Sequence, residues 1–171
     1  MQESRNMLTE SARIARGSVK EISSVAPADI DALVIPGGFG SAKNFTTWAF
    51  DGPGGEILPE IKLFLVNLVN IGKPIAALCV SPVVLSKALQ GSNIHSEMTI
   101  GSDKEDSPYS IADFSAGLES CGVQPKMKTI KEIHVDVENK IVTAPCYMMD
   151  ASILEVRKNI YAAVKALKEL V

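Results

Sequence analysis

The stretch GKPIAALCVSPVVLSKAL, residues 72–89, constrains the fold more than any other part of the sequence. Its first half, residues 73–78, is a short apolar run after a glycine, which is typical of a buried strand. Ser81 can cap a helix, and Pro82 suits a first helical turn because its missing N–H is not needed there. Apolar residues then continue with helical spacing. The stretch therefore predicts a strand followed at once by a helix, with Cys79 at the junction.

A cysteine at such a junction can be a nucleophile. Its thiol would lie near unpaired backbone N–H groups and the positive end of the helix dipole, both of which favour the thiolate. The alternative is a small buried side chain that only fills the core, which is what most cysteines do. The local sequence leaves both interpretations open for Cys79.

Composition limits the class of protein. A chain of 171 residues with 46% hydrophobic and 22% charged residues is typical of one globular domain. The net charge of −3 gives no electrostatic reason to expect nucleic acid or an anionic membrane as a partner. The longest apolar run, around residues 64–71, is far too short to span a membrane.

The cysteines and histidines predict no disulfide framework and no metal site. Cys79, Cys121 and Cys146 are odd in number, widely spaced and without a CxxC pair, which favours a reducing compartment. His95 and His134 are far apart and lack ligand-like spacing, so we expect His95 at the surface and His134 in a strand.

A second notable segment is PGGFGSAKN, residues 36–44, which follows the apolar run at residues 32–35. We predict that this run is a buried parallel strand. The glycine-rich segment does not match a phosphate-binding GxxxxGK[ST] loop or a GxGxxG motif. It is either a flexible turn or a set of backbone N–H donors directed at a substrate oxygen.

The other elements follow from periodicity. We expect helices at residues 3–16, 58–71, 111–121 and after a cap at Asp150; strands at 98–100, 126–130, 133–137 and 141–143, the last two as a hairpin; an extended segment at 19–22; and a surface loop at 48–55. Strands alternating with helices predict an α/β domain with a parallel sheet. Residues 143–149 leave the hairpin toward the sheet end where we expect Cys79.

Three motifs together resemble one protein family. PGGFGSAKN, GKPIAALCVSP and VENKIVTAPCYM occur in that order and at similar spacings in the ElbB-like (ES-one) family of the class I glutamine amidotransferase-like (DJ/PfpI) superfamily, and ESARIARG near the start also resembles it. The resemblance covers nearly the whole chain. It implies a flavodoxin-like three-layer α/β sandwich with a mostly parallel sheet and a nucleophile elbow at Cys79.

The resemblance also implies a site and an activity. Backbone N–H groups near Gly38 and Val80, in a site that includes Gly37 and Phe39, would bind the oxyanion. Relatives are described as glutathione-independent glyoxalases, which predicts a small dicarbonyl substrate, no cofactor, a homodimer, and a mitochondrial or cytoplasmic rather than secreted protein. One alternative is a redox-sensing, stress or chaperone-like protein in which Cys79 is the oxidation site and Cys146 can resolve the oxidised Cys79. Another is a glutamine amidotransferase-like subunit.

Two departures from the family pattern matter. Val80 follows Cys79, so a Cys–His dyad of the protease kind is not supported, and no convincing His–Glu pair supports an amidotransferase. Family members also begin with a strand, a helix and a second strand, and an acidic residue after the first strand contacts the cysteine. The expectation is an N-terminally truncated domain in which Met1 is an internal methionine of a longer protein. Such a sheet would be unstable or completed by a partner chain.

Overall fold

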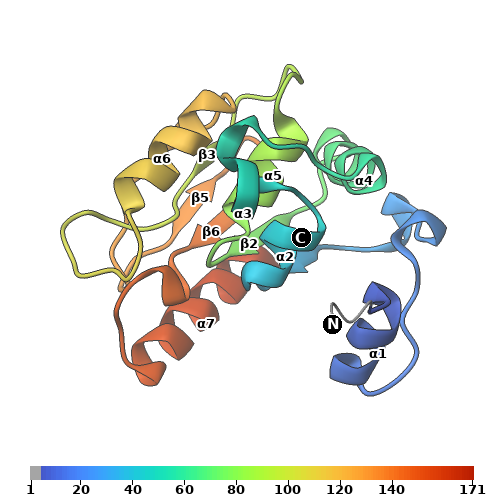
Figure 1. Ribbon diagram of the computed structural model, residues 1–171, viewed down its shortest axis with the longest axis horizontal. Helices are drawn as coiled ribbons and strands as arrows, with labels where there is room; N and C mark the ends of the chain where they lie inside the picture. Colours follow the sequence, from blue (N-terminus) through green and yellow to red (C-terminus); the bar gives the residue numbers. More distant parts are fainter. Residues whose placement is uncertain (1–4) are drawn as a thin grey trace.

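The computed structural model describes residues 5–171, in which a four-stranded sheet has helices on both faces (Figure 1). The strands of this sheet lie in the order β1-β2-β6-β5. β1, β2 and β6 are parallel, and β5 pairs antiparallel with β6. Their bounds are Leu33–Ile35 for β1, Ile75–Leu78 for β2, His134–Asp136 for β5 and Ile141–Ala144 for β6. β3 (Glu97–Met98) and β4 (Gln124–Pro125) form a separate parallel pair.

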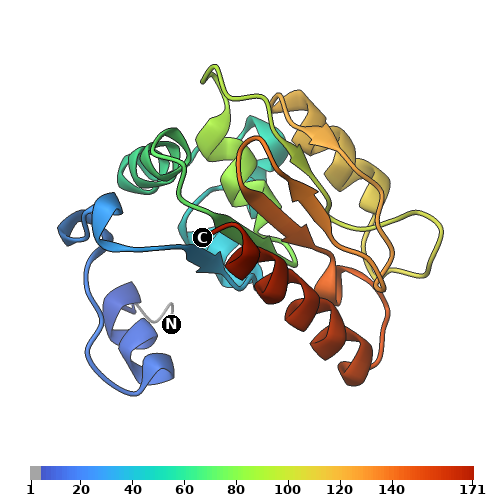
Figure 2. The ribbon, with the colours of Figure 1, turned by 180° about the vertical axis from the view of Figure 1, so that it is seen from behind.

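Helices cover both faces of the sheet. Their bounds are Met7–Ala15 for α1, Phe39–Asn44 for α2, Trp48–Asp51 for α3, Pro59–Asn70 for α4, Pro82–Leu89 for α5, Ile111–Ser120 for α6 and Ile153–Glu169 for α7. α7 crosses one face of the sheet, as Figure 2 shows, whereas α5 packs on the other face with α4 and α6 beside it. This arrangement confirms the predicted α/β sandwich with a mostly parallel sheet.

The core is centred on β2 and α5. All four residues of β2 are buried, and so is every residue of α5. β2 has neighbours on both sides in the sheet and helices on both faces, so its sequence is apolar throughout rather than alternating. α5 is enclosed by the sheet, α4 and α6, which explains why it is apolar all round. The helix after Cys79 is therefore held rigidly.

Several predicted elements are confirmed. The helices at residues 58–71 and 111–121, the strand before Cys79 and the hairpin of β5 and β6 appear within a few residues of their expected bounds. The strand predicted at residues 32–35 is β1 and is parallel, but the exposed fraction of Val34 is 41%. β1 lies at the edge of the described sheet, so part of it faces outward rather than being fully buried.

Other expectations are wrong. Residues 126–130 form no strand in the described structure, because the chain pairs with β3 through the earlier residues of β4 and then leaves it. The segment at residues 19–22 contains no described strand, and a 3₁₀ turn begins at Ile22. The expected loop at residues 48–55 is the short helix α3 followed by a 3₁₀ turn, with Trp48 buried.

The helix ends also differ from expectation. α7 is capped by Ser152, which forms a capping box with Glu155, and not by Asp150. α1 ends at Ala15, one residue before the expected end, and Arg16 is its C-cap residue in a left-handed conformation. The first residues of the helix predicted from Glu3 lie outside the described residues. No helix between residues 5 and 171 is long and apolar enough to cross a membrane.

Candidate active site at the strand–helix junction

Cys79 lies where the sequence places it, directly after β2 and three residues before α5 begins. Its φ of 57° puts it in the left-handed region, which is uncommon for a residue other than glycine. Its backbone N–H donates to the Ala144 carbonyl at 2.9 Å, so the ladder between β2 and β6 holds the strained turn in place. Strained backbone of this kind is frequent at functional sites.

Gly37 is packed directly against this turn. A Cβ atom on Gly37 would lie 2.7 Å from the Cβ of Cys79 and 2.8 Å from the Leu78 carbonyl oxygen. The φ of Gly37 is 101°, which side chains rarely adopt. The glycine is therefore needed both for its backbone angle and for the close approach of the two loops.

A cavity of about 290 Å³ opens above the thiol. It is lined by residues from the β1–α2 loop, the strand–helix junction, the loop before α6, the turn after β6, and α7: Pro36, Gly38, Phe39, Cys79, Val80, Tyr109, Cys146, Tyr147, Met148 and Ile160. The structure thus brings together Gly38, Phe39, Cys79 and Val80, as the sequence predicts. Gly37 lies against Cys79 rather than on the cavity wall.

The glycine-rich segment is neither a flexible turn nor an extended loop throughout. Its second half is α2, which begins at Phe39. Gly38, the residue before this helix, has a positive φ of 84°. The Ser41 hydroxyl donates to the Gly38 carbonyl at 2.8 Å, which fixes the start of the helix. Gly38 is therefore the residue before a short helix at the cavity wall. This geometry is compatible with the interpretation of the segment as a group of backbone donors.

The cavity wall is aromatic and uncharged. Tyr109 packs against Phe39, with ring centroids 5.7 Å apart, and against Phe114 at 6.3 Å. Among residues 5–171, no Asp, Glu, His, Lys or Arg lines the cavity. Its polar groups are the backbone, two thiols and two phenol hydroxyls. Such a site suits a small neutral molecule better than a charged one.

Cys146 lines the cavity although the sequence did not place it among the oxyanion or catalytic residues. It follows β6, has a φ of 49°, and its backbone N–H donates to the Asn159 side chain at 2.9 Å. The pKa of the Cys146 thiol is raised to about 12, mainly because the thiol is buried. Two smaller effects on this pKa oppose each other: a hydrogen bond from the Cys79 backbone N–H lowers it, and the charge of Cys79 raises it. The prediction that residues 143–149 reach the sheet end of Cys79 is confirmed.

Two lining residues had no signal in the sequence. Tyr109 comes from a turn-rich loop, and Ile160 comes from the middle of α7. Only the packing of that loop and helix against the sheet end brings them to Cys79. Ser81 is the N-cap residue of α5, but within the described structure its buried hydroxyl makes no hydrogen bond.

The histidines and the third cysteine lie elsewhere. His95 is exposed. His134 is in β5, where its Nε2 lies 3.1 Å from a carboxylate oxygen of Glu97, and burial is the main cause that lowers its pKa. Cys121 is buried at the end of α6. In the part of the chain that the structure describes, no group of three or more His, Cys, Asp or Glu residues could hold a metal ion.

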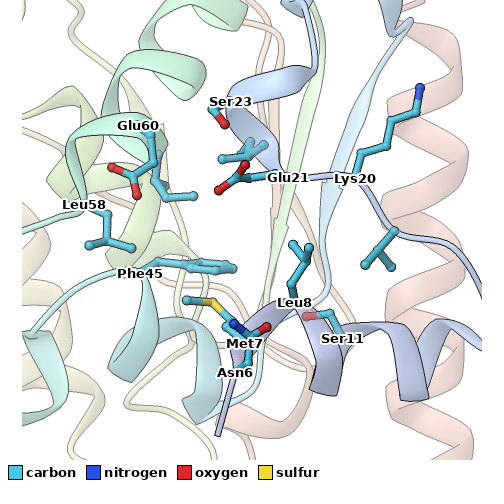
Figure 3. Close-up of a pocket in the computed structure, with 13 residues that line it drawn as sticks. Asn6, Met7, Leu8, Ser11, Lys20, Glu21, Ser23, Phe45, Leu58 and Glu60 are labelled. Atoms are coloured by element: carbon cyan, nitrogen blue, oxygen red, sulfur yellow. The ribbon is translucent and has the colours of Figure 1, made fainter.

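A larger hollow of about 410 Å³ lies between the N-terminal segment and α4. Figure 3 shows Met7 and Leu8 of α1 facing this space, with Phe45 and Leu58 on its other side. Its lining contains Glu21 and Glu60 but neither a cysteine nor a histidine. Because no cysteine lines this hollow, we assign the candidate active site to the smaller cavity at Cys79.

A cysteine on a left-handed turn between a parallel strand and a helix, facing a small cavity, defines an α/β protein with a nucleophile elbow. No family model matches the chain. A human protein named glutamine amidotransferase-like class 1 domain-containing protein 3, mitochondrial, is 38% identical over 98% of this chain and 62% of its own length. The rat ES1 protein homolog, mitochondrial, is 37% identical over the same shares.

A solved structure agrees with these relatives. The isoprenoid biosynthesis protein with amidotransferase-like domain from Ehrlichia chaffeensis superposes with a TM-score of 0.84 at 34% identity, over 99% of this chain and 73% of that one. The chain belongs to the ES1/ElbB-like family of class I glutamine amidotransferase-like proteins. It spans less than two thirds of the length of the human and rat relatives.

Proposed function

We propose that the protein is a cysteine-dependent, glutathione-independent enzyme of the glyoxalase type that converts glyoxal or a related small dicarbonyl to a hydroxy acid. The observation that carries the proposal is the position of Cys79, on a strained turn at the mouth of a small uncharged cavity. Dicarbonyls are small, neutral and electrophilic, so this cavity suits them in size and charge. Cys79 would be the catalytic residue.

The proposed reaction begins with the Cys79 thiolate, which adds to one aldehyde carbon and forms a hemithioacetal. The developing oxyanion would accept hydrogen bonds from backbone N–H groups around Gly38 and Val80, two residues of the cavity wall, next to Gly37 and Phe39. A proton then moves from this carbon to the neighbouring one through an enediolate, which gives a thioester. Water hydrolyses the thioester and returns the thiol, so glyoxal and water become glycolic acid without an oxidant.

The proton transfer needs a base that the described cavity wall lacks. No carboxylate or imidazole from residues 5–171 lines the cavity. We therefore expect this chain to form the hemithioacetal faster than it converts this adduct to the hydroxy acid. We also expect a small carboxylate such as acetate to raise the rate of turnover at constant pH and ionic strength. The human and rat relatives are longer than this chain. We propose the same activity for a protein of this family at that full length.

The test follows [¹³C₂]glyoxal by NMR in the presence of the 171-residue chain, with and without acetate. We expect signals of glycolate to grow with time, and to grow several-fold faster with acetate, because added base replaces the missing proton acceptor. Chloride at the same ionic strength is the control for the added salt. Glyoxal signals that decay only at the protein-free rate under every condition would contradict the proposed function.

A glutamine amidotransferase-like activity is the second candidate, because the names of the human relative and the Ehrlichia protein contain that class. Glutamine carries an ammonium and a carboxylate group, and the described cavity wall offers neither a counter-charge nor an imidazole. Binding it there would leave its charges unpaired. Ammonia released from glutamine, in parallel samples that contain glutamine in place of glyoxal, would favour this candidate instead.

Location and assembly belong to the same proposal. The human and rat relatives are named as mitochondrial proteins, and we propose mitochondria as the compartment of this protein too. A homodimer stays a prediction, which a molar mass from light scattering would check. A cofactor is not part of the proposed reaction, and neither nucleic acid nor a membrane is a proposed partner.

A further inference from the structure

Two thiols from separate segments meet at the cavity. Cys79 follows β2 and Cys146 follows β6, and both line the same space of about 290 Å³. β2 and β6 are parallel neighbours in which Leu78 pairs with Ala144, so the two cysteines come one and two residues after a pair in register. All three cysteines of the chain lie in the described residues and are free thiols.

The backbone holds both thiols at this place. Cys79 and Cys146 have φ values of 57° and 49°, which turn the chain sharply at the end of each strand. The Cys79 N–H bonds to the Ala144 carbonyl, and the Cys146 N–H bonds to Asn159, whose own amide donates to the Glu132 carbonyl at 2.7 Å. Neighbouring strands run about 4.8 Å apart, and the Cα atoms of bridged cysteines lie about 4.4–6.8 Å apart. A pair just beyond two adjacent strand ends therefore suits a disulfide.

We propose that Cys79 and Cys146 form a reversible intramolecular disulfide when a peroxide oxidises Cys79. In the first step the Cys79 thiolate attacks hydrogen peroxide, the O–O bond breaks, and sulfenic acid and hydroxide form. In the second step the Cys146 sulfur attacks the sulfenic sulfur, and its proton leaves with the hydroxyl group as water. The peroxide accepts two electrons in total, one from each thiol. The bond would block the nucleophile and protect it from irreversible oxidation.

The two thiols have different roles because they differ in exposure. Cys79 is partly exposed to the cavity, whereas Cys146 is 2% exposed. A peroxide therefore reaches Cys79 first. Cys121 is buried at the end of α6 and is not a cavity residue. The structure thus singles out Cys146 as the resolving thiol.

The high pKa of Cys146 slows the second step without preventing it. With a pKa of about 12, the thiolate fraction is on the order of 10⁻⁵ at pH 7. Two groups held in reach of each other have effective molarities of about 10⁵ M or more, which offsets this fraction. The sulfenic acid should therefore persist long enough to be trapped, and its conversion to the disulfide should accelerate by about tenfold per pH unit below pH 9.

The test treats the reduced chain with one equivalent of hydrogen peroxide, blocks free thiols with N-ethylmaleimide, and maps peptides by mass spectrometry without reduction. We expect a peptide pair joined through Cys79 and Cys146 that dithiothreitol separates. Early samples should contain Cys79 sulfenic acid, trapped by dimedone. Raising the pH after the peroxide has been removed should speed formation of the pair. This readout needs no catalytic turnover, so it is independent of the proposed glyoxalase activity.

Two variants provide controls. Cys146→Ala should retain the dimedone-reactive Cys79 but form no joined pair, and it should progress to sulfinic acid at higher peroxide. Cys121→Ser should form the same pair as the unmodified chain. Oxidation of Cys79 directly to sulfinic acid in the unmodified chain, or a pair that contains Cys121, would overturn the proposal. The peptide map of the unmodified chain remains decisive if Cys146→Ala does not fold.

Discussion

A Cys79→Ser variant is expected to consume glyoxal at least about 100-fold more slowly than the unmodified chain. Serine keeps the shape of the side chain, but its hydroxyl is a far weaker nucleophile than a thiolate and has no base beside it on the described cavity wall. The loss should appear in the rate of glycolate formation and not in the folded fraction, which circular dichroism measures.

Cys121→Ser is the matched control for this prediction. It makes the same chemical change at a buried site outside the cavity, so its turnover should remain within about twofold of the unmodified chain. Turnover by Cys79→Ser that matched the unmodified chain would remove Cys79 from the reaction. A loss in both variants would point to unfolding instead, which the circular dichroism spectra would reveal.

The second large effect is expected for Gly37→Ala. The new Cβ would lie 2.7 Å from the Cys79 Cβ and 2.8 Å from the Leu78 carbonyl oxygen, neither of which can rotate away, and the φ of 101° is unfavourable for alanine. Backbone strain and overpacking together predict a loss of about 2–5 kcal/mol in the free energy of unfolding. Urea denaturation followed by the fluorescence of Trp48, the single tryptophan, measures it.

Gly38→Ala separates the two causes. Gly38 also has a positive φ, of 84°, but no described atom lies within 4 Å of a Cβ placed there. We therefore expect a loss of only about 1 kcal/mol, from the backbone angle alone. If the two variants lose the same stability, the close packing of Gly37 against Cys79 does not matter for the fold.

The strand–helix junction could be predicted because each local signal agrees with the others. A continuous apolar run predicts β2, and Pro82 at the first turn predicts α5. The α/β order and the hairpin of β5 and β6 follow from similarly short-range patterns. These elements are determined by residues close together in the sequence.

The missed elements depend on contacts between distant residues or on subtle local choices. The short helix α2 begins within a glycine-rich segment that has little helical signal. The chain after β4 leaves the short pairing with β3, and no local pattern reveals where that pairing ends. Ser152 rather than Asp150 caps α7 because Glu155 lies three residues after it and completes the capping box.

The candidate site could be predicted only in the neighbourhood of Cys79. The motifs identified Cys79, Gly38, Phe39 and Val80, and the structure places these four on one cavity wall. Tyr109 and Ile160 join them only through the packing of a loop and a helix far along the chain. The uncharged character of the wall, on which the proposed preference for a dicarbonyl over glutamine depends, could therefore be recognised only from the fold.

Cys79 is proposed to be the reactive thiol of this cavity, and timed alkylation by iodoacetamide at pH 7 tests this most directly, with each cysteine quantified by peptide mass spectrometry. We predict that Cys79 reacts at least about tenfold faster than Cys121 and Cys146, which are 5% and 2% exposed, and that glyoxal slows the alkylation of Cys79 alone. Equal rates at the three cysteines, or a Cys79 rate that glyoxal does not change, would contradict it.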